Sequence, residues 1–519
     1  MNSIHQFSLR HVAEGHGVYT KKNGNLYARI DVAKRKGKSV VKETTNLGRV
    51  LDKEKGIYKN RERGIFTYDL TTNTYGSVGN DFIDPTTTPK KEELILDFGD
   101  TYLLSEFINN FPQLKDALSS IGINQMDTFW TLLYYYILSS HANSHCDIWA
   151  RGNLARILFP HADLSSQRIS DLLQTLGEEW VYRKFFKSYL KLFKDDFDGD
   201  GSNILIDSTG LPNDVHFPLT AVSNHNGEIE NEVRLIYVTQ QETGLPVYFR
   251  YCAGNVIDVS TLSRTIEELK HNGINTKFSI LDAGYLTLQN MGYLYENHVS
   301  FLTRVKPNLK LYKDVIAEHF ESLRCRENFI TYNERTLYLK RIPIEVEVGK
   351  DHTYKGYAYL GLDESQQGLE RKGIVKRAKN KGLGDGEIYD QVQSRGVFML
   401  FSTRKIALDK VLPLYYTRDQ IEKVFSIGKG EANLLPIRTH TEATFRGHLL
   451  LTFMATVVIK LMKDTLKGCG MTFETAMMEM RNQKCLVYDD AVITREPQAM
   501  MNQIYKTCKI KCPVSIPRT

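Results

Sequence analysis

The sequence is poor in the features that mark secreted, disulfide-stapled or membrane-spanning proteins. Its 519 residues include only 7 Cys and no Cys-x-x-Cys pair, so neither a disulfide framework nor a zinc ribbon is predicted. The longest mainly apolar run, residues 449–459, is far shorter than the roughly 20 residues that cross a bilayer. The first residues lack a charged segment followed by an apolar one, so no secretion signal is expected. We therefore expect a cytoplasmic protein with no membrane partner.

Two groups of His and Cys residues stand close together in the sequence but are poor metal-site candidates. One group is His141, His145 and Cys146, and the other is Cys508 and Cys512 with Cys469 before them. Neither has the ligand spacing of a structural zinc site. We interpret both groups as ordinary buried or exposed side chains.

Positive charge is concentrated near the N-terminus. Residues 31–63 contain 11 Lys or Arg against 5 Asp or Glu, a net charge of +6 that equals the formal charge of the whole chain. Short alternating segments with intervening glycines predict strands here. Residues 1–95 are therefore predicted to be a basic β-rich DNA-binding module with a linker. A solvated charged surface explains the charge equally well.

The rest of the chain predicts an α/β protein with a mixed sheet. Apolar residues at three-to-four spacing predict a helical region, and a series of short apolar runs then predicts strands separated by helices. The expected divisions are a helical region at 96–195, the first part of the core at 196–308, a strand-rich insertion at 309–395, the second part of the core at 396–465 and a C-terminal tail at 466–519.

The stretch "DDFDGDGSNILIDSTG", residues 195–210, has two familiar interpretations that we disfavour. Asp196, Asp198, Asp200 and Gly201 fit the first half of an EF-hand loop, but the following segment contains Gly210 and Pro212 and cannot form the second helix. The order Asp-Ser-Thr-Gly is one residue longer than an aspartic-protease loop, and no second copy exists to share a proton.

A third interpretation makes Asp207 part of a pair. "NILID" and "SILDAGY" each have apolar residues, then Asp, then small residues. This pattern predicts two strands that stop on Asp207 and Asp282, and ligands collect at such strand ends in α/β sheets. Two neighbouring carboxylates repel each other unless a cation lies between them. Each aspartate alone is more often a turn residue, so a third carboxylate is needed.

A helix further along supplies a third carboxylate. In "YYTRDQIEKVFSIGK" the residues Tyr415, Arg418, Glu422 and Lys429 fall on one helical face. A surface helix with salt bridges would give the same spacing. Around one acid, however, a phenol and two cations also suit a phosphodiester beside a metal ion.

This spacing, Tyr-x2-Arg-x3-Glu-x6-Lys, resembles the signature of the DDE transposases of bacterial insertion sequences, a group with a ribonuclease H-like core. The segments "ILIDSTG", "SILDAGY", "GVFMLFSTR" and "LLPIRTHTEATFRGHLLLTF" are similar to that family as well, so the resemblance covers roughly residues 100–465. It implies a ribonuclease H-like mixed sheet that a strand-rich insertion interrupts.

The resemblance also implies the roles of the site residues. Asp207, Asp282 and Glu422 would be the catalytic acids and would bind two Mg²⁺ or Mn²⁺ ions, with Asp207 bridging them. Tyr415, Arg418 and Lys429 would hold DNA phosphates. The expected activity is cleavage and strand transfer of double-stranded DNA at the inverted repeats of the transposon ends and at target DNA, by a homodimer.

Two points stay open in the sequence. Hairpin-forming members of the family place an aromatic residue, often Trp, in the insertion, whereas this chain has Trp only at 130, 149 and 180. The residues that remain for this role are Tyr312, Tyr332, Tyr338 and Tyr354. The alternatives to a transposase are a non-catalytic DNA-binding regulator and a stand-alone ribonuclease H-like nuclease.

Overall fold

The structure is a computed structural model that divides into two compact units, Met1–Glu93 and Leu94–Thr519. The acidic residues of the disfavoured calcium loop, Asp196, Asp198 and Asp200, lie outside the described residues, as does most of the expected linker. The described residues are 6–7, 18–21, 25–36, 39–69, 72, 74–78, 82, 94–193, 203–213, 219–225, 228–256, 258–348, 352–380, 384, 392 and 395–518.

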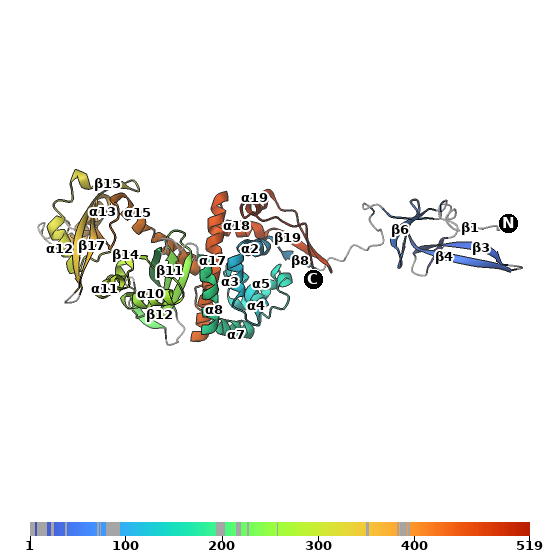
Figure 1. Cartoon of the computed structure of the whole chain (residues 1–519), viewed down its shortest axis with the longest axis horizontal. Helices are drawn as coiled ribbons and strands as arrows, with labels where there is room; N and C mark the ends of the chain where they lie inside the picture. Colours follow the sequence, from blue (N-terminus) through green and yellow to red (C-terminus); the bar gives the residue numbers. More distant parts are fainter. Residues whose placement is uncertain are drawn as a thin grey trace. The chain divides into compact units, whose positions relative to one another are not determined.

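The N-terminal unit contains an antiparallel sheet (Figure 1). Its strands follow the order β1-β3-β4-β5-β6-β7, and β2 also pairs with β3. Apolar side chains on one face form a small core of their own, consisting of Ala28, Ile30, Leu47, Tyr58 and Phe66. The strands are β1 (Gln6–Phe7), β2 (Val18–Thr20), β3 (Leu26–Lys36), β4 (Ser39–Asp52), β5 (Ile57–Asn60), β6 (Gly64–Asp69) and β7 (Thr74–Gly76).

Helices dominate the first hundred residues of the second unit. In α7 the buried residues Ile169, Leu172, Leu173 and Leu176 recur at three-to-four spacing, so one face of the helix enters the core. The elements are β8 (Leu94–Asp97), α2 (Gly99–Asn109), α3 (Pro112–Ser119), α4 (Met126–Leu138), η1 (Asn143–His145), α5 (Cys146–Arg151), α6 (Ala155–Leu158), α7 (Ser166–Leu176), α8 (Glu179–Tyr189) and η2 (Leu190–Phe193).

A large mixed sheet follows, with the strand order β10-β11-β9-β13-β14-β18-β17-β16-β15 and with β12 pairing on β11. Strand β13 is parallel to both β9 and β14, whereas β11 is antiparallel to β9. The first elements are β9 (Asn203–Pro212), β10 (Ala221–His225), β11 (Glu228–Gln240), β12 (Pro246–Ala253), η3 (Asp258–Thr261), α10 (Leu262–His271), β13 (Phe278–Leu281), η4 (Ala283–Tyr285), α11 (Leu288–Glu296) and β14 (Ser300–Arg304).

The residues of the expected insertion extend this same sheet. Strand β18 pairs with β14 on one side and with β17 on the other, so hydrogen bonds run without a break from β9 to β15. The elements are α12 (Lys310–His319), η5 (Arg326–Asn328), β15 (Phe329–Tyr332), β16 (Arg335–Val348), β17 (His352–Asp363), α13 (Glu364–Asn380) and β18 (Val397–Ser402).

The expectation that residues 309–395 are strand-like is wrong for two segments. Lys310–His319 and Glu364–Asn380 are helices. Residues 371–380 of the basic stretch lie in the second of them, where Lys, Arg, Gln and Glu favour a helix through their unbranched side chains. That helix has no apolar stripe to give a periodic signal.

The C-terminal residues are folded rather than a tail, which corrects the prediction for 466–519. Strand β19 pairs with β8 from the start of the unit, and the small sheet has the order β21-β20-β19-β8. Arg481 also forms an ion pair with the fully buried Asp100 of α2, at 2.9 Å. The elements are η6 (Lys467–Cys469), α18 (Phe473–Arg481), β19 (Lys484–Val487), β20 (Ala491–Thr494), α19 (Ala499–Thr507) and β21 (Ser515–Pro517).

Helix α17 (Glu442–Leu466) joins the helical region to the sheet, and Figure 1 shows it between them. The Thr441 side chain accepts a hydrogen bond from the Thr444 backbone N–H, which begins the helix with a capping box. At Gly447 a Cβ atom would lie 1.8 Å from the Leu173 carbonyl oxygen, so only glycine allows α17 to approach α7 this closely. Helices α15 (Leu408–Tyr416) and α16 (Asp419–Gly430) precede it.

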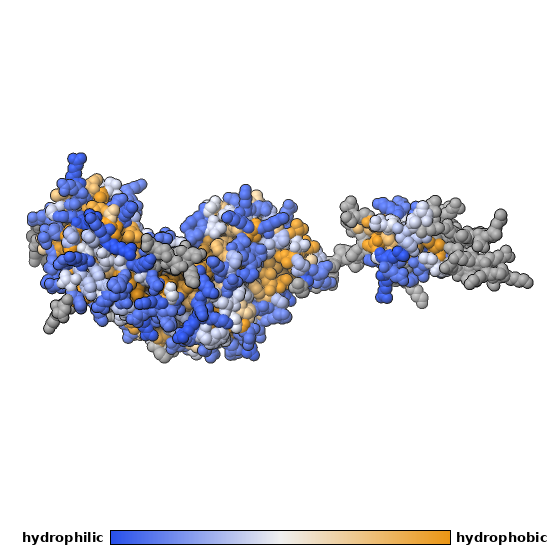
Figure 2. Space-filling view, in the orientation of Figure 1, coloured by the Kyte–Doolittle hydropathy of each residue, from blue (hydrophilic) through white to orange (hydrophobic). Residues whose placement is uncertain are grey.

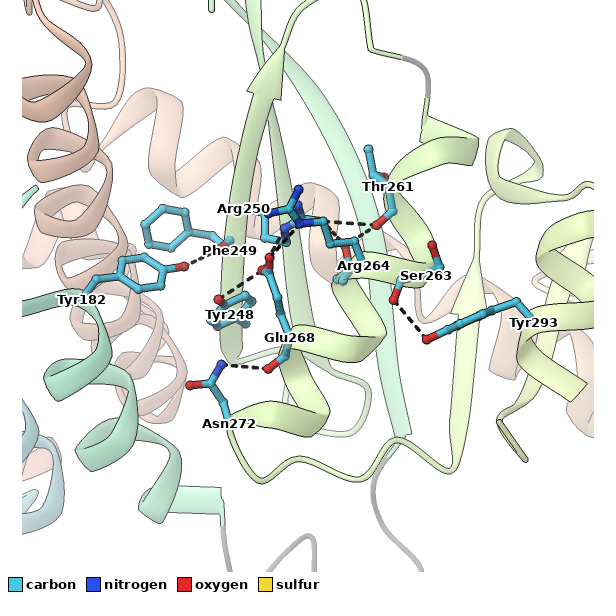
Figure 3. A network of polar contacts seen from close by, with 11 residues as sticks. Tyr182, Tyr248, Phe249, Arg250, Thr261, Ser263, Arg264, Glu268, Asn272 and Tyr293 are labelled. Atoms are coloured by element: carbon cyan, nitrogen blue, oxygen red, sulfur yellow. Dashed lines mark hydrogen bonds and ion pairs between the residues drawn. The ribbon is translucent and has the colours of Figure 1, made fainter. Parts of the chain in front are cut away.

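A polar network attaches α8 and α10 to the strand β12 (Figure 3). Arg250 on β12 forms an ion pair with Glu268 of α10 at 2.9 Å, and the Tyr248 hydroxyl donates to the same carboxylate at 3.3 Å. From the other side the Tyr182 hydroxyl of α8 donates to the Phe249 carbonyl at 2.7 Å. These residues line a hollow of about 1030 Å³. Because the ion pairs are satisfied within the network, we interpret it as a structural link.

The surface drawn in Figure 2 is largely hydrophilic, with hydrophobic residues in smaller areas between. Helix α17 is the longest helix of the described residues, yet Glu442, Arg446, Lys460, Lys463 and Asp464 interrupt its apolar residues. Within the described part of the chain, no helix combines the length and the apolar character that a membrane crossing requires.

Candidate active site

The sheet register places Asp207 and Asp282 side by side. In the parallel pairing of β9 with β13, the last pair is Ile206 with Leu281, and Asp207 and Asp282 are the next residues of the two segments. The expectation that the first strand stops on Asp207 is wrong, because β9 continues to Pro212 by pairing with β11. Strand β13 does end at Leu281. Asp207 therefore lies within a strand, where its backbone is fixed on the β11 side.

The two carboxyl groups differ in their surroundings. Burial raises the pKa of the Asp207 carboxyl from 3.8 to about 6, against the opposing effects of the Arg418 cation and the Ser208 backbone N–H. The Asp282 side chain is 39% exposed and caps the short helix η4, accepting a hydrogen bond from the Gly284 N–H at 3.3 Å. One acid is thus enclosed, and the other opens toward solvent.

A single guanidinium group bridges these acids. Arg418 Nη2 lies 3.1 Å from Asp207 Oδ2, and Arg418 Nη1 lies 2.9 Å from Asp282 Oδ1. The Arg418 side chain is only 15% exposed, and its Nε has no hydrogen-bond partner among the described residues. Burial acts to lower the pKa of Arg418, but the charges of Tyr415, Asp282 and Asp207 outweigh it and raise the pKa.

Tyr415 completes this cluster from the helix before. Its hydroxyl accepts a hydrogen bond from Arg418 Nη1 at 3.1 Å, and burial raises the pKa of the phenol. Arg418 stands between α15, which ends at Tyr416, and α16, which begins at Asp419. The bend between two helices therefore carries both side chains to the aspartates.

Lys429 is anchored to the sheet at the other end of α16. Its ammonium group donates to Thr209 Oγ1 at 2.7 Å and to the Gly210 carbonyl at 2.9 Å. Burial lowers the pKa of Lys429, and the nearby Glu232 opposes this shift. Lys429 thus holds the C-terminal turn of α16 on β9, two residues beyond Asp207.

The sequence analysis missed two buried charges that lie beside this anchor. Glu232 and Arg234 of β11 form an ion pair at 3.2 Å, with side chains that are 6% and 7% exposed. A Cβ atom at Gly210 would lie 1.8 Å from the Glu232 carboxylate, so a larger residue there would displace that side chain from its place in the ion pair. The Asp-Ser-Thr-Gly segment marked Thr209 and Gly210 as part of a candidate site. Nothing in the local sequence pattern distinguishes Glu232 from a surface residue.

Glu422 does not join the two aspartates. It is exposed, one helical turn after Arg418. Within the described residues, no group of three or more His, Cys, Asp or Glu side chains is close enough to hold a metal ion. The structure therefore brings together Asp207, Asp282, Arg418 and Tyr415, and it leaves Glu422 outside that cluster.

The four tyrosines of the insertion lie in different settings. Tyr312 is buried and donates to the Val397 carbonyl, while Tyr354 stacks on Tyr295 at 4.2 Å between ring centroids. Tyr338 contacts the edge of Phe329. Only Tyr332, among these four, stacks on Tyr416, with ring centroids 5.5 Å apart. Of these four tyrosines, Tyr332 is thus the one that lies against α15, the helix that carries Tyr415.

These features define a class of protein, a mixed α/β chain whose central parallel strands bring two aspartates to one cationic helix end. Residues 198–458 match the family described as "Transposase DDE domain". This match spans half of the chain, and the chain belongs to the DDE transposase family. No curated protein matches the chain.

One solved structure with a detectable likeness is a cryo-EM structure of a piggyBac transposase synaptic complex with hairpin DNA. The likeness covers 79% of this chain and 70% of that chain, with a TM-score of 0.33 and 10% sequence identity.

Proposed function

We propose that the chain is the transposase of a bacterial insertion sequence, with a ribonuclease H-like catalytic core, that binds the ends of its element and cleaves and transfers DNA strands. The observation that carries this proposal is the convergence of Asp207 and Asp282 on Arg418 and Tyr415. Acids from two neighbouring strands there meet the Tyr and the Arg of the Tyr-Arg-Glu-Lys signature at one helix bend.

The residues present fit a divalent cation. Asp207 Oδ2 and Asp282 Oδ1 already approach one positive group from two strands. Carboxylate oxygens without His or Cys suit Mg²⁺ or Mn²⁺. Asp207 and Asp282 would hold the ions, and Glu422, which lies outside their cluster, would have to approach them to be the third ligand. When bound, two such ions supply a nucleophilic oxygen and stabilise the leaving oxygen.

The remaining residues bind and position the DNA. Arg418 suits a phosphate because a guanidinium donates two parallel hydrogen bonds, and the Tyr415 hydroxyl adds a further donor. Lys429 keeps the end of α16 on β9 through Thr209 and Gly210. Tyr332, with Tyr416, would offer an aromatic surface to a base near the site.

The separate N-terminal unit is the proposed reader of the transposon end. Its basic residues make salt-dependent contacts to phosphates, which suits double-stranded DNA. The active form would be a cytoplasmic homodimer that holds two ends. The exposed position of Glu422 favours one second candidate, a non-catalytic DNA-binding regulator.

Cleavage of a linear DNA that carries the element's end separates the two candidates. The parent protein should cut at the end in Mg²⁺, and Asp207→Asn should bind the same DNA without cutting it. Equal binding by both proteins with no cleavage by the parent would instead support the regulator.

A further inference from the structure

Arg418 occupies the position at which the two aspartates would meet a metal ion. Each acid gives one oxygen to the guanidinium, Asp207 Oδ2 at 3.1 Å and Asp282 Oδ1 at 2.9 Å. We propose that Arg418 is a built-in counter-ion that closes the site to divalent cations until a DNA phosphate draws it away, so that DNA loads the metal. This inference rests on the proposed function.

The Arg418 guanidinium and a divalent cation cannot occupy the space between the two acids at the same time. A divalent cation that used Asp207 Oδ2 and Asp282 Oδ1 would stand against the guanidinium, and like charges at such short range repel strongly in a partly buried site. Arg418 and Asp207 are only 15% and 16% exposed, so water screens this repulsion poorly. Metal binding therefore requires Arg418 to leave at least one of the acids.

The position of Arg418 in the fold allows that movement. It lies between the end of α15 and the start of α16, so no helical turn encloses its side chain on both sides. Its Nε has no partner among the described residues, and a phosphate oxygen would satisfy this donor. The bond from Nη1 to the Tyr415 hydroxyl gives the moving guanidinium a second attachment.

A phosphate is the partner that competes best with two carboxylates. Its oxygens accept bidentate hydrogen bonds from a guanidinium in the same geometry as a carboxylate does. By linkage, a DNA that takes Arg418 raises metal affinity, and metal raises the affinity for that DNA by the same factor. The free protein would then bind metal weakly and avoid cutting before an end is engaged.

The test measures Mn²⁺ binding by electron paramagnetic resonance of the free ion, using the full-length chain. The DNA is a duplex of the element's terminal repeat that already ends flush at the repeat, so no bond remains to be cut. Arg418→Gln removes the charge and keeps an amide that can hydrogen-bond to Tyr415. The matched control is Arg304→Gln, which removes a charge near Tyr415 from an exposed side chain with no ion pair to the two acids.

Without DNA, Arg418→Gln should bind Mn²⁺ roughly tenfold more tightly than the parent, and Arg304→Gln should bind like the parent. The duplex should raise Mn²⁺ affinity about tenfold in the parent and in Arg304→Gln, but little in Arg418→Gln. Equal Mn²⁺ affinity in Arg418→Gln and the parent would overturn the proposal, as would an undiminished effect of DNA on Arg418→Gln.

Two further measurements keep the result decisive. Asp207→Asn should weaken Mn²⁺ binding in every condition. Unchanged Mn²⁺ binding by Asp207→Asn would refute the metal site of the proposed function itself. If Asp207→Asn binds Mn²⁺ weakly but Arg418→Gln binds it like the parent, only the role of Arg418 is refuted. Should Arg418→Gln fail to fold, Arg418→Lys serves in its place, because the shorter Lys side chain carries one ammonium group instead of the planar fork of the guanidinium. Its Mn²⁺ affinity should exceed that of the parent, and equality would count against the proposal.

Discussion

The rings of Tyr237 and Phe425 stack with centroids 5.3 Å apart and an interplanar angle of 7°. Tyr237 is the cross-strand partner of Asp207, and Phe425 lies on α16, one turn after Glu422. The contact therefore fixes the helix that carries the signature above the strand that carries the first aspartate. Lys429 provides a second attachment on the same strand.

Replacing Phe425 by alanine should damage the site as well as the fold. Loss of a buried phenyl ring costs about 3–5 kcal/mol of unfolding free energy. Phe107→Ala, in α2, removes another buried ring away from the site and is the matched control. Urea unfolding should give similar losses for both, while DNA cleavage by the folded protein should fall much further in Phe425→Ala. Equal cleavage by the two variants would show that Phe425 does not position the site.

Glu422→Gln separates an enzyme from a binder. The change keeps the size of the side chain and leaves the packing of Ile421, Val424 and Phe425 intact, so folding and end binding should survive. Cleavage in Mg²⁺ should fall roughly a hundredfold or more, because a charge that stabilises the transition state is lost. Glu474→Gln changes an exposed glutamate of α18 and should cut normally. Normal cutting by Glu422→Gln would rule out the three-carboxylate mechanism.

Stability should fall in mild acid because of His448. Burial lowers the pKa of this imidazole from 6.5 to about 4, and its ring nitrogens contact the Tyr136 hydroxyl and the Leu434 carbonyl. The unfolded chain takes up a proton below pH 6.5 and the folded chain does so only below about pH 4. The contribution of neutral His448 to the free energy of unfolding is complete above pH 6.5 and is lost as the pH falls from 6.5 to 4. The loss is about 2 kcal/mol at pH 5 and about 3 kcal/mol at pH 4.

The measurement is urea unfolding at pH 7 and pH 5 for the parent and for His448→Gln. Other acids change their protonation in both proteins, so the difference between the two pH dependences isolates His448. Glutamine can accept from Tyr136 and donate to Leu434 without titrating. Identical pH dependences would show that the imidazole is not held neutral in the folded protein.

Removal of residues 1–93 should abolish specific end binding and leave the second unit folded. The two units have separate hydrophobic clusters, and β8 begins at Leu94, where it pairs with β19. Binding to a duplex of the terminal repeat should be lost, and the slope of log affinity against log salt concentration should become less steep for any residual binding. Undiminished specific binding by the shortened chain would assign end recognition to the second unit.

The sequence predicted the parts of the fold that local patterns encode. The apolar runs before Asp207 and Asp282 predicted two strands. The spacing of Tyr415 and Arg418 predicted one helical face, although Tyr415 lies on α15 and Arg418 lies between α15 and α16. The two acids are neighbours because their strands pair in parallel. Neither Asp motif alone suggested this pairing, and only the two motifs together did.

What the sequence could not predict depends on distant pairing or on uniform polarity. Strands β8 and β19 lie almost 400 residues apart, so neither has a local signal for the other. Helix α13 is mainly polar and its few apolar residues form no stripe, so it gives no periodic signal. The sequence also did not predict that Arg418 bridges both acids, because an arginine at this position is equally what a phosphate-binding site requires.

Strand β18 has a consequence for shortened copies of this chain. Its neighbours are β14 of the core and β17 of the insertion, and Met399, Leu400 and Phe401 in its middle are buried. Loss of residues 309–395 would leave an apolar strand with an unpaired edge along its whole length. Such edges recruit strands from other molecules, so a chain trimmed in this way would aggregate rather than persist as a smaller nuclease.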